Sequence, residues 1–177
     1  MYELLHQMIA PYYLYIKMIH VPAVTVWSFS VIMGYYFFLV PVMQAWRKNE
    51  SDAGLAIMRN WVFERFDHGV KVEHYAFPLV LLSGVLLIIA GGWGPESRWL
   101  MLKLSLIMVA VVPMEIVDYY ISHFHGNKRH LREKGDNDDW EAYEDALHRH
   151  WWFFLITTPL VGLVILGVFF LAFIKPF

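Results

Sequence analysis

Long apolar segments alternate with charged ones along this 177-residue chain. The apolar segments cover residues 18–46, 75–95, 99–122 and 151–174. Each meets or exceeds the roughly 20 residues that a helix needs to cross about 30 Å of hydrocarbon. The third segment is the only one that contains charged residues. Because every backbone N–H and C=O needs an internal partner in lipid, these segments predict membrane-spanning helices.

The pattern therefore predicts an all-α integral membrane four-helix bundle in a single domain, residues 1–177. We expect helices over about residues 12–46, 75–95, 98–122 and 138–174. Apolar residues at spacings of three and four predict that the last helix begins outside the membrane as an amphipathic extension; they are Trp140, Tyr143, Leu147 and Trp151. A further short helix is expected at the headgroups around Ile57, Trp61 and Phe66.

The basic residues predict the orientation of the bundle. Of the 14 Lys and Arg residues, ten lie in the segments 44–74 and 122–150. The positive-inside rule places these segments and their helical extensions in the cytoplasm, with both termini outside. We therefore predict a multi-pass protein of the bacterial inner membrane with periplasmic N- and C-termini.

Composition agrees with the bilayer as the main partner. Hydrophobic residues make up 58% of the chain and charged residues 17%, whereas soluble domains carry about 25% charged residues. The 14 basic and 16 acidic residues give none of the basic excess of nucleic-acid-binding proteins. The absence of cysteine excludes disulfides, thiolate metal sites and covalently attached c-type haem.

Nine histidines are the first candidates for chemistry, and most fall near the predicted cytoplasmic face. There the ends of three helices bring together His74, His123 or His125, and His148 or His150. Imidazole binds haem iron, copper and non-haem iron, so we take His74, His123, His148 and His150 as candidate metal ligands. In each His-x-His pair the rings point about 200° apart, so at most one faces inward. The alternative is a set of interfacial histidines with hydrated rings.

His20 and Lys103 lie inside apolar segments, at similar depth near the outer side by helical rise. Ionisable residues inside a membrane are candidates for function. The alternatives are a His20 that bonds to a backbone carbonyl and a Lys103 that extends toward water. Glu115 and Asp118 lie on one stripe of the third helix. They predict a proton relay or carboxylate ligands, unless Asp118 pairs with a Lys or Arg of the segment 122–150.

Four short motifs connect the chain to a known family: Lys17-Met18-Ile19-His20-Val21 followed by Trp27, Pro78 with Gly84, Trp99-Leu100-Met101-Leu102-Lys103-Leu104, and Lys175-Pro176-Phe177. They resemble the HemJ family of membrane protoporphyrinogen oxidases, within a wider group of membrane haem or copper proteins that includes CopD-like domains. The likeness covers most of the membrane part and not the two long loops. It implies a four-helix scaffold for haem b, with His20 as an axial ligand and Lys103 and Trp27 near the porphyrin.

The chain departs from the family pattern at two places. The resemblance therefore implies the scaffold but not the family's reaction. Met114, preceded by Pro113, stands where the family has a histidine preceded by a tyrosine. A thioether can also bind haem iron axially, so Met114 is the candidate second ligand. The fourth helix has Ile156-Thr157-Thr158-Pro159 in place of the family's Asn-Glu-x-Pro, which leaves the substrate open.

The leading hypothesis is a membrane b-type haem protein for electron transfer or for oxidation of a lipophilic substrate, with a quinone or porphyrinogen as partner. Lys103 and Glu115 are its candidate catalytic residues. One candidate iron site is His20 with Met114 or another partner, and the other is His74 with His123 or His148. The two sets lie on the order of 20 Å apart, so they cannot share one iron, and two haems would need both. One alternative is a membrane protein that handles copper or iron. Another is a non-catalytic subunit or assembly factor, as a homo-oligomer or in a larger complex.

Overall fold

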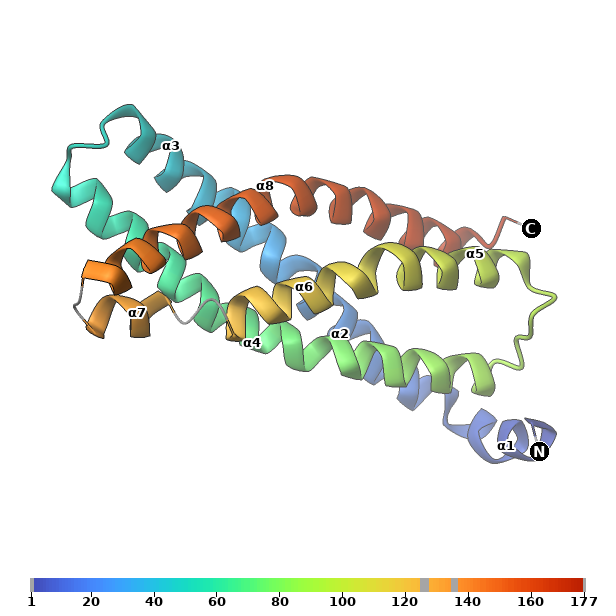
Figure 1. The fold of residues 1–177 in the computed structure, drawn as a ribbon. Coiled ribbons are helices and arrows are strands. Elements are labelled where there is room, and N and C mark those ends of the chain that lie inside the picture. Colours follow the sequence, from blue (N-terminus) through green and yellow to red (C-terminus); the bar gives the residue numbers. More distant parts are fainter. Residues whose placement is uncertain (1, 125–127, 135–136, 177) are drawn as a thin grey trace.

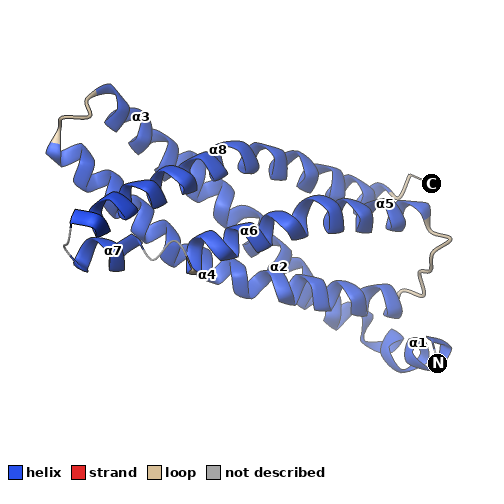
Figure 2. Cartoon of the chain, viewed as in Figure 1, coloured by secondary structure: helices blue, strands red, loops and turns tan. Residues whose placement is uncertain are grey.

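The computed structural model describes residues 2–124, 128–134 and 137–176, and within these residues it contains helices and connecting loops only (Figure 2). The elements in chain order are α1 (Tyr2–Ile9), η1 (Ala10–Tyr12), α2 (Tyr13–Gly34), η2 (Tyr35–Leu39), α3 (Val40–Lys48), α4 (Ala53–Ala90), α5 (Arg98–Leu106), η3 (Ile107–Val111), α6 (Val112–His123), α7 (Lys128–Lys134) and α8 (Asn137–Ile174). Of these, η1 is a 3₁₀ turn, and η2 and η3 are π-helical turns.

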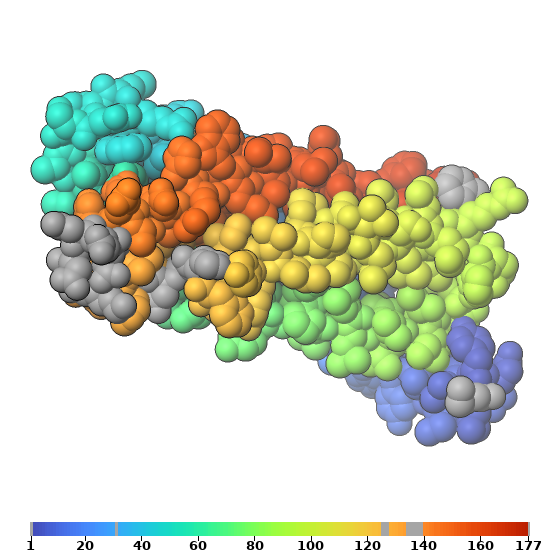
Figure 3. Space-filling view, in the orientation of Figure 1, coloured from blue at the N-terminus to red at the C-terminus, as the bar shows by residue number. Residues whose placement is uncertain are grey.

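Four helical rods are long and apolar enough to cross a membrane, which confirms the multi-pass prediction: Tyr2–Lys48, Ala53–Ala90, Arg98–Glu133 and Trp140–Ile174. Figure 1 shows them lying lengthwise beside one another. The α3–α4 turn and α7 lie at one end, here called the loop end. Both termini and the α4–α5 connection lie at the other, here called the terminal end. In Figure 3 the N-terminal residues project from the terminal end.

The second rod differs from the sequence prediction. The short interfacial helix expected around Ile57–Phe66 is the beginning of one continuous helix, α4. Its N-terminus is capped by Asp52 Oδ1, which accepts hydrogen bonds from the backbone N–H groups of Gly54 and Leu55. The polar start of α4 needs no break because its side chains have partners on neighbouring rods. Arg59, for example, lies over the Trp46 ring and pairs with Glu144.

Two prolines explain the π-helical turns. Pro41 follows η2 and Pro113 follows η3, each at the start of the next α-helical segment. Proline lacks the N–H for the i−4 hydrogen bond, and its ring collides with that carbonyl. A widened turn before the proline accommodates both effects, and such turns often occur at functional sites. Met114 and Glu115 lie directly after the second one.

The interior of the bundle consists of successive apolar clusters. The cluster at the loop end is largely aromatic and includes Tyr35, Phe63, Tyr143, Trp151 and Phe154. The middle cluster is formed by Trp27, Ala76, Val111 and Ile165. The terminal end is filled by Trp99, Leu100 and Leu171. Many large apolar side chains are exposed on the outside, among them Phe37, Tyr75, Val109, Leu163 and Phe173. So apolar a surface is suited to lipid.

Candidate functional site

Hydrogen bonds around His20 decide which of its ring nitrogens carries the proton. The Ser83 hydroxyl on α4 donates to the backbone carbonyl of Leu79, so it has only lone pairs left for other partners. Ser83 Oγ lies 2.9 Å from His20 Nδ1, which must therefore be the donor. This order of hydrogen bonds assigns the proton to Nδ1 and leaves the lone pair on Nε2. His20 is thus in the form that can bind a metal through Nε2.

The surroundings of His20 are closely packed on the α4 side and positively charged. A Cβ added to Gly84 would stand 3.5 Å from His20 Cε1, so the ring lies directly against the backbone of α4 at this glycine. The half-buried Lys103 of α5 interacts electrostatically with both His20 and Lys175. Within the described part of the chain, no carboxylate forms an ion pair with Lys103. An ammonium group without a counter-ion at this depth indicates a place for an anionic ligand group.

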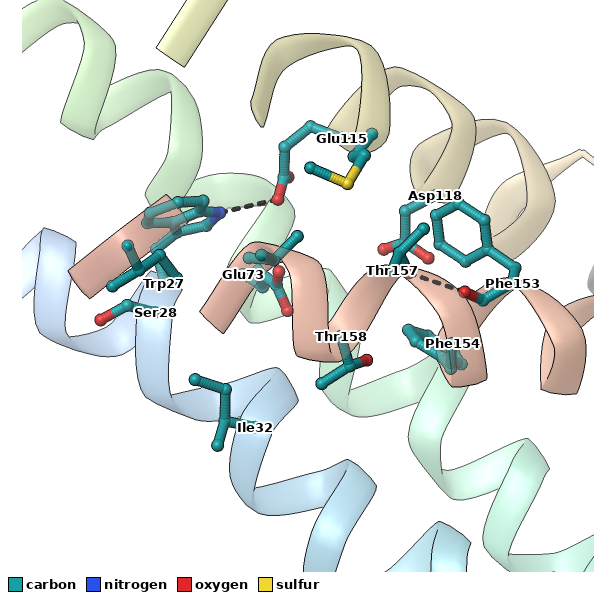
Figure 4. A pocket seen from close by; sticks show the side chains of 13 residues that line it. Trp27, Ser28, Ile32, Glu73, Glu115, Asp118, Phe153, Phe154, Thr157 and Thr158 are labelled. Carbon is teal, nitrogen blue, oxygen red and sulfur yellow. Dashed lines mark hydrogen bonds between the residues drawn. The ribbon is translucent and has the colours of Figure 1, made fainter. Parts of the chain in front are cut away.

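Trp27 and Met114 belong to a different place from His20. Trp27 Nε1 donates a 2.8 Å hydrogen bond to Glu115 Oε1, and Met114 lines the same interior cavity (Figure 4). Trp27 follows His20 by seven residues on α2, which is about 10 Å along the helix axis. The structure therefore does not bring Met114 to His20, and it places the Trp27–Glu115 pair nearer the loop end.

The loop-end histidines converge on Asp118 of α6. His74 Nε2 lies 3.1 Å from Asp118 Oδ2, and His74 Nδ1 lies 2.9 Å from His123 Nε2. On the other side, His150 Nε2 is 3.6 Å from Asp118 Oδ1. Asp118 is only 5% exposed. The Lys or Arg partner expected for this residue is therefore replaced by histidines, together with the Ser122 hydroxyl at 3.4 Å.

For the pair His148 and His150 the structure shows which ring faces the interior. Of the pair His123 and His125 it describes only the first. His150 is fully buried, and its Nδ1 lies 2.6 Å from Lys128 Nζ. His148 is exposed and accepts a hydrogen bond from Trp152 Nε1. His123 joins the network at Asp118, whereas His125 lies outside the described residues. The convergence of helix ends is thus seen for His74, His123 and His150.

These histidines are arranged as a hydrogen-bond network. The facing nitrogens of His74 and His123 bond to each other and do not point at a common centre. Within residues 2–124, 128–134 and 137–176, no group of three or more His, Asp or Glu side chains could hold a metal ion. We therefore assign no metal to His74, His123, His148 or His150.

Three residues of this region were not found from the sequence. Glu73 is buried and accepts a hydrogen bond from the Ser30 hydroxyl at 3.3 Å. Lys128 is fully buried, with Nζ 2.6 Å and 2.7 Å from the two carboxylate oxygens of Asp67. The signal for Glu73 is its position directly before His74 at the start of an apolar segment. Asp67 and Lys128 lie in charged segments where nothing marks them out.

Comparisons of the chain with models of protein families, with curated proteins and with solved structures found no match. What the fold and the site define is a class: a four-helix membrane protein with a ligand-ready histidine toward the terminal end and a buried polar network toward the loop end.

Proposed function

We propose that this protein is a membrane b-type haem protein in which His20 Nε2 would bind the iron. The observation that carries the proposal is the hydrogen bond from His20 Nδ1 to Ser83, whose own proton is held by Leu79. Histidines that bind metals almost always donate their second ring N–H in this way, which fixes the tautomer and the ring orientation. The resemblance of residues 17–27 to the HemJ family points to the same histidine.

Other residues near His20 suit the porphyrin. The unpaired ammonium group of Lys103, with Lys175 close by, would hold a propionate carboxylate through a charge-assisted hydrogen bond. Met114 is not assigned to the iron, because the cavity that it lines has a volume of about 40 Å³. A cavity of this volume holds about three water molecules and no porphyrin.

Haem would supply one-electron chemistry, and the chain would bind it, orient it and keep it dry. We propose electron transfer with a quinone or oxidation of a lipophilic substrate such as a porphyrinogen, because the exposed side chains of the rods are largely apolar. Lys103 beside His20 remains the candidate catalytic residue of the haem site. We further propose that the loop end faces the cytoplasm of a bacterial cell, since it carries most of the basic residues.

The test is the visible spectrum of the wild-type protein, purified in detergent from cells supplied with haem precursors. We expect a Soret band that shifts on reduction with dithionite, and a pyridine haemochrome of haem b in an amount equal to that of the polypeptide. Copper or iron without a Soret band would overturn the proposal in favour of metal handling. A colourless, metal-free protein would overturn it in favour of a non-catalytic subunit or assembly factor.

A further inference from the structure

A small cavity with carboxyl and hydroxyl groups in an otherwise apolar wall lies in the bundle between the middle and loop-end clusters. Its wall holds the carboxyl groups of Glu73, Glu115 and Asp118, contributed by α4 and α6. Ser28 of α2 and Thr158 of α8 lie across from them, as Figure 4 shows. With a volume of about 40 Å³, the cavity accommodates about three water molecules and excludes larger organic molecules.

Polar atoms in this wall lack protein partners. Ser28 Oγ, Thr158 Oγ1 and Glu115 Oε2 are buried and have no hydrogen-bond partner in the described part of the chain. Ser28 and Thr158 are each 3% exposed. Buried polar groups are nearly always satisfied by protein or by ordered water. Donors and acceptors from three helices that face one small cavity indicate that water is its ligand.

Asp118 connects this cavity to the histidines, and the chemistry of the groups fixes the direction of the bonds. A carboxylate only accepts hydrogen bonds, so His74 Nε2, 3.1 Å from Asp118 Oδ2, is the donor. Neutral His74 then accepts at Nδ1, where the donor is His123 Nε2 at 2.9 Å. The result is an ordered series of hydrogen bonds from His123 through His74 to Asp118.

The His123 end of this series opens to a polar basin at the loop end. His123 lines the basin, which has a volume of about 580 Å³ and is surrounded by charged residues such as Asp67, Lys71 and Arg129. A second connection, from Asp67 through Lys128 to His150, also ends near Asp118. His150 Nε2 is 3.6 Å from Asp118 Oδ1 and makes no hydrogen bond within the described residues, so this second connection is interrupted before Asp118.

We propose that the series from the basin through His123, His74 and Asp118 to the cavity is a proton half-channel. A proton taken up from water by His123 releases the Nε2 proton of that ring to His74 Nδ1. His74 in turn releases its Nε2 proton to Asp118, so one proton moves inward and no electron is transferred. Water in the cavity carries the proton on to Glu115, which is bonded to Trp27.

The path ends at Trp27. Directly beyond it, toward the terminal end, lie apolar residues of the middle cluster such as Ala76, Val80, Val111 and Ile165. No hydrogen bond of the described residues links the path to His20 and Ser83, which lie farther toward that end. A path that stops at a buried carboxylate exchanges protons with one side of the membrane only. The half-channel does not depend on the presence of haem. Only the use of its protons in redox chemistry rests on the proposed function.

Infrared spectroscopy of the protein in lipid membranes tests the half-channel without any haem signal. Repulsion between the carboxylates of the cavity favours a shared proton on Glu73 and Glu115. We expect a carboxylic-acid C=O band that weakens in Glu73→Gln and Glu115→Gln and shifts when the buffer is changed to D₂O. In His123→Phe this shift should be slower by at least about tenfold. The phenyl ring keeps the contact with Tyr119, whose ring centroid is 4.5 Å from that of His123.

The matched control is His148→Phe, the same substitution on an exposed histidine of the loop end, and its exchange rate should equal that of wild type. Asp118→Asn keeps the size of the side chain and should slow the exchange as His123→Phe does. The proposal is overturned if the wild type has no carboxylic-acid band. It is equally overturned if either network variant, shown to be folded by its amide bands, exchanges as fast as wild type, or if His148→Phe is slowed to the same extent.

Discussion

His20→Ala should yield a folded four-helix protein that has lost most of its haem b. The ring is half-buried, hydrogen-bonds to α4 at Ser83 and belongs to none of the three apolar clusters, so its removal leaves the clusters intact. Met114 cannot replace the missing ligand, because it lies about two helical turns nearer the loop end than residue 20. We expect a haem-to-polypeptide ratio at least about tenfold below that of wild type, measured as the pyridine haemochrome.

The control for this variant is His148→Ala, which also removes an imidazole but at an exposed position outside the buried network. It should bind as much haem as wild type. If His20→Ala kept its full haem content while His74→Ala or His123→Ala lost it, the iron would lie at the loop end. The assignment of His20 would then be wrong.

Lys128→Met is expected to produce the largest loss of stability. The Lys128 ammonium is fully buried and contacts both carboxylate oxygens of Asp67 and the ring of His150. Methionine fills a similar volume but removes the ammonium partner of Asp67, whose side chain is 13% exposed. Because only the lysine side of the pair is fully buried, the cost should lie near the lower end of the range for a broken buried ion pair, about 3 kcal/mol. For a chain of this length the loss corresponds to a melting temperature lower by about 10 °C, measurable by circular dichroism in detergent.

Arg129→Met is the matched control, since Arg129 is the next residue of α7 and pairs with Glu133 at the exposed surface. Water and salt screen exposed pairs of this kind, so the melting temperature should hardly change. Adding Asp67→Asn to Lys128→Met removes the unpaired charge and should recover much of the loss. Equal melting temperatures for Lys128→Met and Arg129→Met would show that the Lys128–Asp67 pair does not hold the loop end together.

The sequence predicts the features of the fold that depend on local properties. Apolar length alone indicates the rods, and the expected start of the last helix at residue 138 agrees with α8, which begins at Asn137. Helical rise also predicts that His20 and Lys103 lie at a similar depth, in agreement with their electrostatic interaction. These inferences require only the geometry of a single helix.

The features that depend on packing between rods could not be predicted in the same way. Whether His148 or His150 points inward depends on the rotation of α8 relative to α6, which no local pattern fixes. The continuity of α4 depends on partners such as Glu144 that are distant in the sequence. Asp67 and Lys128 are separated by 61 residues, and their pairing follows only from the position of α7.

The most direct measurement of the coordination bond is the visible spectrum of His20→Gly, purified with and without imidazole. Glycine removes the ligand and leaves a space of the size of the ring, so free imidazole can bind the iron in its place. The account predicts no Soret band without imidazole and a band of nearly wild-type intensity with it. A Soret band of full intensity in the protein purified without imidazole would contradict the assignment of His20 as the haem ligand.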